Sequence, residues 1–154
     1  MRRKDREITD INKIFEIVDK CNICRIAMID GDEPYIVPMN FGFSQKEMCL
    51  YFHCAREGRK IDILQVNPKV CFQMDTDYSL IVTEIAVECT SNFNCIMGTG
   101  NIEFIENRDE KIFALDKLME KDTKKPSWDY PEEMLNMVCV FKLKIDKISC
   151  KSKI

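Results

Sequence analysis

The sequence predicts a mainly β protein, built as an antiparallel barrel or curled sheet with peripheral helices. Six or seven short apolar segments typical of strands follow one another, mostly through turns. Strands and helices alternate too rarely for a doubly wound parallel sheet. No Gly-x-Gly-x-x-Gly or Walker-type loop is present, so classical dinucleotide or nucleoside triphosphate binding has no sequence support. No linker or internal repeat interrupts the chain, and we expect one domain over residues 1–154.

Apolar periodicity and turn residues set the expected elements. Strands are expected at residues 23–29, 34–43, 48–52, 69–74, 80–88, 94–106 and 141–146. Helices are expected at residues 9–20 with Thr9 or Asp10 as cap, at 107–121 with Asn107 as cap, and briefly after Gly58 and from Pro131. Pro38 cannot donate to a ladder and marks an edge or a bulge. Gly98 and Gly100 let their strand bend or let another backbone or a ligand approach closely.

Composition excludes several classes of protein. With 45% hydrophobic and 32% charged residues the chain is an ordinary globular protein, and its net charge of -3 argues against a general nucleic-acid binder. No apolar run approaches membrane-spanning length, and the N-terminal residues lead into a helix instead of a signal-peptide core. We therefore expect a cytoplasmic protein without nucleic-acid or membrane partners.

Nine cysteines are many for 154 residues, and the number is odd. Without a secretory signal a disulfide framework is not expected. Cys21 and Cys24 have the spacing of a redox or zinc half-site, but no second pair follows and a zinc site needs four ligands. Most of the others fall within apolar strand patterns and are expected to be buried core residues. These are Cys49, Cys71, Cys89, Cys95 and Cys139.

The candidate site is the stretch in which a strand ends at His53 and Cys54 and a short helix begins after Gly58. Arg59 and Lys60 stand in the first turn of that helix, where cations are unfavourable for the helix itself. A bound anion would make the two cations favourable at this point, because the helix N–H groups, the guanidinium and the ammonium can converge on one phosphate. The alternative interpretation is a solvated basic turn without a ligand.

Three blocks of sequence carry a family resemblance: residues 34–43, 50–64 and 67–72. They resemble the pyridoxamine-phosphate-oxidase-like FMN-binding split barrel, and within it the branch associated with 5-nitroimidazole resistance. The likeness extends from Ile8 to Lys151. It implies a six-stranded antiparallel split barrel that forms a homodimer, with one FMN in each of two clefts between the subunits.

The resemblance also implies roles for individual residues. Arg59 and Lys60 match the pair that holds the FMN phosphate, while His53 and Cys54 match positions beside the ribityl chain and ring. The stretch that presents backbone groups to the edge of the isoalloxazine corresponds here to Val37, Pro38, Met39 and Asn40. His53 also matches the histidine implicated in the active site of the resistance branch; alternatively, its imidazole only bonds a flavin or backbone group.

Two positions depart from the family pattern. Relatives usually carry a Ser-Val pair before the Gly-x-Gly bend, where the serine reaches the phosphate; Cys95 and Ile96 stand there instead. Because a thiol is a poor donor to an anion, we expect weaker phosphate binding or a replacement group. Near the C-terminus Ser149-Cys150-Lys151 stands in place of a Thr-Gly-Lys, which affects the terminal turn and not the fold.

The expected function is FMN-dependent reduction of a small electron-poor molecule such as a nitroaromatic, with His53 as candidate catalytic residue. Flavin supplies the electron chemistry and the protein positions it. Two alternatives remain open: a flavin-binding module without turnover of its own, and a haem-binding split barrel with His53 as axial ligand.

Overall fold

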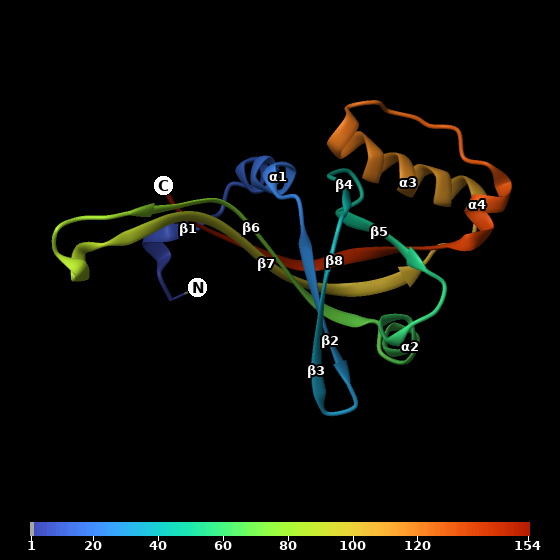
Figure 1. Cartoon of the computed structure of the whole chain (residues 1–154), viewed down its shortest axis with the longest axis horizontal. Helices are drawn as coiled ribbons and strands as arrows, with labels where there is room; N and C mark the ends of the chain where they lie inside the picture. Colours follow the sequence, from blue (N-terminus) through green and yellow to red (C-terminus); the bar gives the residue numbers. More distant parts are fainter. Residues whose placement is uncertain (1) are drawn as a thin grey trace.

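The computed structural model describes residues 2–154 and contains one eight-stranded sheet with helices packed against it (Figure 1). The strands are β1 (Glu7–Ile8), β2 (Cys24–Asp30), β3 (Glu33–Met39), β4 (Gly42–Ser44), β5 (Cys49–Ala55), β6 (Lys69–Ile81), β7 (Thr90–Phe104) and β8 (Val138–Lys153). The helices are α1 (Ile11–Lys20), α2 (Arg59–Val66), α3 (Arg108–Thr123) and α4 (Glu132–Met137), with short 3-10 turns η1 (Lys4–Arg6) and η2 (Ala86–Glu88). None of these helices is long and apolar enough to cross a membrane.

The hydrogen-bonded order is β3-β2-β6-β7-β8-β5-β4, and β1 pairs with β8. Every recorded pairing is antiparallel, which confirms the predicted fold class. The expected number of six strands is wrong, because the sheet has eight. The chain between Met39 and Gly42 leaves the ladder, so the strand expected at residues 34–43 becomes β3 and β4. β1 is a second short addition, of two residues.

The core lies against one face of the sheet and is rich in phenylalanine. Phe52, Phe72 and Phe141 are fully buried, and Phe52 stacks on Phe141 with ring centroids 5.4 Å apart. In β2 alternate residues are buried, as expected for a strand with one face in the core. The first four residues of β5 are all buried because α3 covers its second face (Figure 1).

The prediction of a separate strand at residues 80–88 is also wrong. β6 continues instead to Ile81 with a register shift between Thr76 and Ser79, and the following residues form the end of a long β6–β7 hairpin (Figure 1). Val82 and Val87 are 71% and 89% exposed there. An apolar segment forms a strand only where another strand lies beside it to accept and donate hydrogen bonds. These residues extend beyond the rest of the sheet.

The predicted helix caps agree with the structure. Asp10 accepts a hydrogen bond from the N–H of Asn12 at 2.9 Å, and Asn107 accepts from Asp109 and Glu110 at 3.0 and 3.1 Å. The expected close approach at the glycine bend is also confirmed, because a Cβ on Gly98 would collide with the ring of Phe72 and the backbone oxygen of Lys147. A register shift follows between Thr99 and Gly100.

Candidate functional site

The candidate site is built around the start of α2. Gly58 precedes the helix with φ 130° and ψ 163°, a backbone conformation that L-residues with a side chain rarely adopt. The N–H groups of Ile61 and Asp62 both bond the carbonyl of Gly58, at 2.8 and 3.3 Å. The N–H groups of Arg59 and Lys60 come earlier in the turn, where a helix has no internal acceptors. They remain available to an external acceptor.

The Arg59 side chain lies on the β2–β3 hairpin. Its Nε donates to Oδ2 of Asp30 at 2.8 Å, and its Nη2 donates to Oε2 of Glu33 at 2.7 Å. The guanidinium carbon sits 4.5 Å from the centroid of the Tyr35 ring. Arg59 also borders a cavity of about 420 Å³ between this hairpin and α2. Two carboxylates therefore compensate the charge that was expected to meet a phosphate.

The charge of Lys60 acts on the end of β5. His53 lies opposite Val140 in the β5–β8 ladder and its side chain is exposed. Partial burial, and secondly the charge of Lys60, lower the pKa of His53 below its ordinary value of 6.5. The same ammonium acts on the neighbouring Cys54 thiol. His53 and Cys54 are thus neighbours on β5 with side chains on opposite faces of the strand, and the charge of Lys60 acts on both. The lowered pKa leaves the imidazole neutral at neutral pH.

The stretch expected at the flavin edge lies at the end of β3. Pro38 is exposed and faces Arg25 in the ladder, on a strand at the end of the sheet order. The expectation that Pro38 marks an edge is confirmed. Val37 is partly buried, Met39 is 8% exposed with its side chain in the core, and Asn40 is exposed. Pro38 and Asn40 are thus exposed and Val37 is partly exposed, whereas contacts through Met39 are left to its backbone.

Cys95 and Ile96 lie elsewhere on β7. Cys95 is opposite Asp75 and Lys151, and its sulfur is 3.8 Å from the amide nitrogen of Gln73. Ile96 is fully buried. Within residues 2–154, no recorded hydrogen bond or ion pair joins either of them to Arg59 or Lys60. Among the described residues, neither position is therefore bonded to the two cations of α2.

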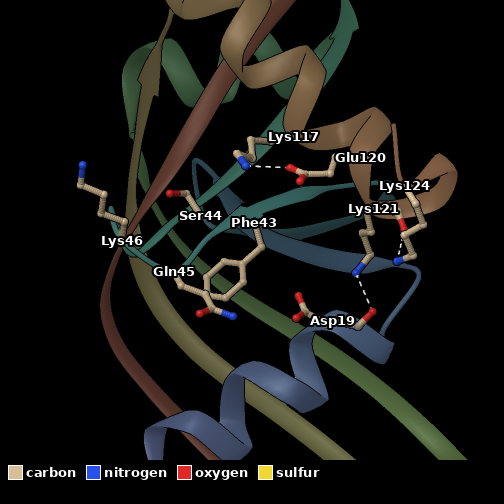
Figure 2. Close-up of a pocket in the computed structure, with 9 residues that line it drawn as sticks. All are labelled: Asp19, Phe43, Ser44, Gln45, Lys46, Lys117, Glu120, Lys121 and Lys124. Atoms are coloured by element: carbon tan, nitrogen blue, oxygen red, sulfur yellow. Dashed lines mark hydrogen bonds and ion pairs between the residues drawn. The ribbon is translucent and has the colours of Figure 1, made fainter. Parts of the chain in front are cut away.

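A cavity of about 460 Å³ between α1, β4 and α3 was not expected from the sequence (Figure 2). Lys117 pairs with Glu120 at 2.7 Å, while the ammonium of Lys121 donates to the backbone oxygens of Val18 and Asp19 at 3.1 and 3.3 Å. The side chains lining the cavity are those of Asp19, Phe43, Ser44, Gln45, Lys46, Lys117, Glu120, Lys121 and Lys124.

The cavity's lysines serve the fold. Lys121 also sits 4.2 Å from the ring centroid of Phe41, and Lys124 donates to the backbone oxygen of Lys121. The sequence signal was the spacing of Lys117, Lys121 and Lys124, which places three cations on one helix face. Protein acceptors thus engage all three ammonium groups, and Lys121 ties the last turn of α1 to α3.

Among residues 2–154 no group of three or more His, Cys, Asp and Glu side chains is arranged to hold a metal ion. Cys21 and Cys24 are both fully buried, and burial raises the pKa of each thiol to about 12. Both thiols therefore stay protonated at neutral pH.

The fold and this arrangement define a split-barrel protein. Residues 10–152 match the family model described as pyridoxamine 5'-phosphate oxidase. The chain belongs to this family, as predicted from its sequence.

Similarity to solved structures indicates the branch of the family. A candidate 5-nitroimidazole antibiotic resistance protein from Bacteroides thetaiotaomicron is 32% identical with a TM-score of 0.84, covering 95% of this chain and 86% of that one. This similarity agrees with the predicted branch. A search of curated proteins found no match.

More distant structures share the fold alone. The flavocytochrome Anf3 from Azotobacter vinelandii is 18% identical, with a TM-score of 0.83 over 100% of this chain and 72% of that one. An FAD and heme binding protein from Mycobacterium smegmatis is 17% identical, with a TM-score of 0.84 over 96% and 73%.

Proposed function

We propose that this protein is a homodimeric FMN-binding reductase that acts on a small electron-poor molecule such as a nitroaromatic. The observation that carries the proposal is the placement of Arg59 and Lys60 in the first turn of one helix, with the charge of Lys60 acting on the only histidine of the chain. Family membership and the similarity to a candidate nitroimidazole resistance protein support it.

The donors at α2 suit a phosphate. Two helix N–H groups without internal acceptors and the side chain of Lys60 belong to the first turn of α2, and the helix dipole favours an anion there. Nη1 of Arg59 has no partner among the described residues. Asp30 and Glu33 already occupy the other donors of Arg59, so a phosphate has to share or displace them. The residues fit the group after this exchange of acceptors.

His53 is placed to act beside the ring of a bound flavin. The imidazole is exposed and neutral at neutral pH, which makes it a hydrogen-bond acceptor or donor toward a ligand. A phosphate near Lys60 opposes the charge that lowers the His53 pKa. The imidazole then takes up a proton more readily and can donate it to a nitro group. When bound, the flavin supplies the electrons.

The homodimer is proposed from surface that one chain leaves uncovered. Along the β6–β7 hairpin five large apolar side chains are between 55% and 89% exposed: Tyr78, Leu80, Val82, Ile85 and Val87. Soluble monomers rarely leave such a set in water. We propose that a second copy also adds residues to the site, as the family resemblance implies.

A haem-binding function is the second candidate, and one observation favours it. A neutral, exposed imidazole is the form that ligates haem iron, and His53 has both properties. Two of the solved structures with the same fold are described as a flavocytochrome and as an FAD and heme binding protein.

Absorption spectra of the full chain, purified and then titrated with FMN or haemin, separate these functions. We expect stoichiometric FMN binding, and turnover of a nitroaromatic once a reductant is added. Saturable binding of haemin that disappears in His53→Ala, with no binding of FMN, would instead assign the haem function. Tight FMN binding without any turnover would leave a binding module.

A further inference from the structure

Cys54 and Cys139 are direct neighbours across two strands. They are partners in the β5–β8 ladder, where their side chains project from the same face of the sheet. Both thiols are free, and each influences the pKa of the other; Sγ of Cys54 donates to the backbone oxygen of Ala55 at 3.1 Å. Cα atoms of opposite residues are about 4.5 to 5.5 Å apart in an antiparallel pair. That range falls within the roughly 4.4 to 6.8 Å that a disulfide spans.

No other two cysteines of the described strands face each other in register. Cys71 lies opposite Thr99 and Ala27, and Cys95 lies opposite Asp75 and Lys151. Of the remaining strand cysteines, Cys24 faces Met39 and Cys49 faces Lys144. Cys150 faces Ile8 on one side and Ile96 on the other. The pair on β5 and β8 is thus a specific arrangement within a chain rich in thiols.

The pair is also accessible. Cys21, Cys24, Cys49 and Cys150 are 0% to 4% exposed, whereas Cys54 and Cys139 are only partly buried. Cys139 borders a cavity of about 210 Å³ together with Arg56, Gln65 and Lys111. The expectation that Cys139 is a buried core residue holds only in part: its side chain packs against the core but is partly buried and borders this opening.

We propose that Cys54 and Cys139 form a dithiol redox site, which a small disulfide of the glutathione class oxidises to a reversible disulfide within the chain. In a reducing cytosol disulfides are usually transient, with catalytic or sensing roles. The proposal concerns the thiols themselves and does not depend on flavin binding.

The chemistry is two successive thiol–disulfide exchanges. The thiolate of Cys54 attacks one sulfur of the small disulfide, forming a mixed disulfide and releasing one small thiol. The thiolate of Cys139 then attacks Sγ of Cys54, forming the Cys54–Cys139 bond and releasing the second small thiol. Two protein thiols lose two electrons and two protons, and the small disulfide is reduced to two thiols.

The surroundings assign Cys54 as the attacking thiol. Burial raises the pKa of both groups, and that of Cys139 to about 11. The charge of Lys60, and secondly the neighbouring Cys139, oppose this effect at Cys54. Since the thiolate is the reactive form, oxidation becomes faster as the pH rises.

The test is a thiol count on the full chain after equilibration with mixtures of reduced and oxidised glutathione. Free thiols are then blocked with N-ethylmaleimide and the peptides are identified by mass spectrometry. We expect the oxidised protein to lose two of its nine thiols, to yield one cross-linked peptide pair containing Cys54 and Cys139, and to regain both thiols with excess reduced glutathione. No thiol loss, or cross-links among other cysteines, would overturn the proposal.

Variants assign the order of attack. Cys139→Ser is expected to stop at a stable mixed disulfide on Cys54, while Cys54→Ser reacts at least tenfold more slowly at Cys139. Cys71→Ser, which removes a partly buried strand cysteine with no cysteine opposite, is the matched control and keeps the cross-link. A mixed disulfide on Cys54 that persists in the unaltered chain would contradict the proposal without relying on the folding of any variant.

Discussion

Arg59 donates from Nε to Oδ2 of Asp30 over 2.8 Å, so a carboxylate holds the residue that the sequence assigns to a phosphate. Glu33 takes a second donor of the same guanidinium at 2.7 Å. A charge-assisted interaction with phosphate must therefore compete with two acidic side chains of the same chain. This competition makes the β2–β3 hairpin part of the proposed cofactor site.

Replacing both acids tests the competition. We expect Asp30→Asn combined with Glu33→Gln to raise FMN affinity several-fold at low salt, because Arg59 is released to the phosphate. The gain stays modest, since all three side chains are largely exposed. Calorimetric titration with FMN measures the change. Asp32→Asn, which removes an unpaired charge at the same turn, is the control; an equal gain there would show a general charge effect.

The single histidine permits a direct titration by NMR. We expect the His53 pKa to lie below 6.5 in the ligand-free protein, because burial and Lys60 disfavour the imidazolium. Since the unfolded chain then binds the proton more readily, this residue reduces folding stability as the pH falls below about 6.5. FMN is expected to raise the His53 pKa, and so to bind more tightly at lower pH. An unchanged His53 pKa after FMN binding would place the phosphate away from Lys60.

Substitution of His53 separates catalysis from binding. We expect His53→Ala to retain FMN and to reduce nitroaromatic turnover by about a hundredfold, as for loss of a general acid. His53→Gln keeps a hydrogen-bond donor but cannot transfer a proton at neutral pH. Steady-state rates with matched FMN occupancy check this. Full activity of the Gln variant would show that His53 only positions a ligand. Loss of FMN from the Ala variant would show that His53 binds the cofactor and would contradict its catalytic role.

Gly42 is a test of the packing that holds α3 on the sheet. A Cβ at this position would lie 2.5 Å from the carbonyl carbon of Lys117 and 2.6 Å from the nitrogen of Leu118. Since these are backbone atoms, we expect Gly42→Ala to lower the free energy of unfolding by about 1–3 kcal/mol. Chemical denaturation measures this value. Lys46→Ala, at an exposed position nearby, should stay within about 0.5 kcal/mol of the unaltered protein.

The sequence predicted the fold where local signals and burial agree. Asp10 and Asn107 cap their helices, and Gly31 turns the β2–β3 hairpin with a φ of 64°, as an Asp-Gly turn requires. The local sequence signals failed where tertiary packing decides whether a segment forms a strand. The apolar residues from Val82 to Val87 suggested a strand, but no neighbouring chain pairs with them. β1 and β4 are too short to show a periodicity.

The site was predicted in part for the same reason. Adjacent residues near the start of α2 were identifiable from the strand, the glycine and the two cations, all within a few positions. The pairing of Arg59 with Asp30 and Glu33 spans 29 and 26 positions and depends on how α2 packs beside β2. Likewise, Cys54 and Cys139 are 85 positions apart in numbering and meet only through the β5–β8 register.

Dimerisation is tested by dilution. If FMN lies between two chains, we expect the fraction bound to fall at protein concentrations where the dimer dissociates. Sedimentation and flavin fluorescence, followed on the same samples, give the two transitions. Val87→Asp, at the exposed end of the β6–β7 hairpin, is expected to shift both transitions to higher concentration. A monomer that keeps FMN tightly bound would contradict the shared site.

The most direct measurement of the central claim compares FMN with riboflavin, which lacks the phosphate. For the unaltered protein and the Arg59→Ala, Lys60→Ala double variant, dissociation constants of both ligands are determined under one set of conditions. We expect the double variant to weaken FMN by at least a hundredfold, since charge-assisted hydrogen bonds contribute roughly 1.5 to 3 kcal/mol each, and to change riboflavin binding little. Equal losses for the two ligands would contradict the assignment of the α2 start as a phosphate site.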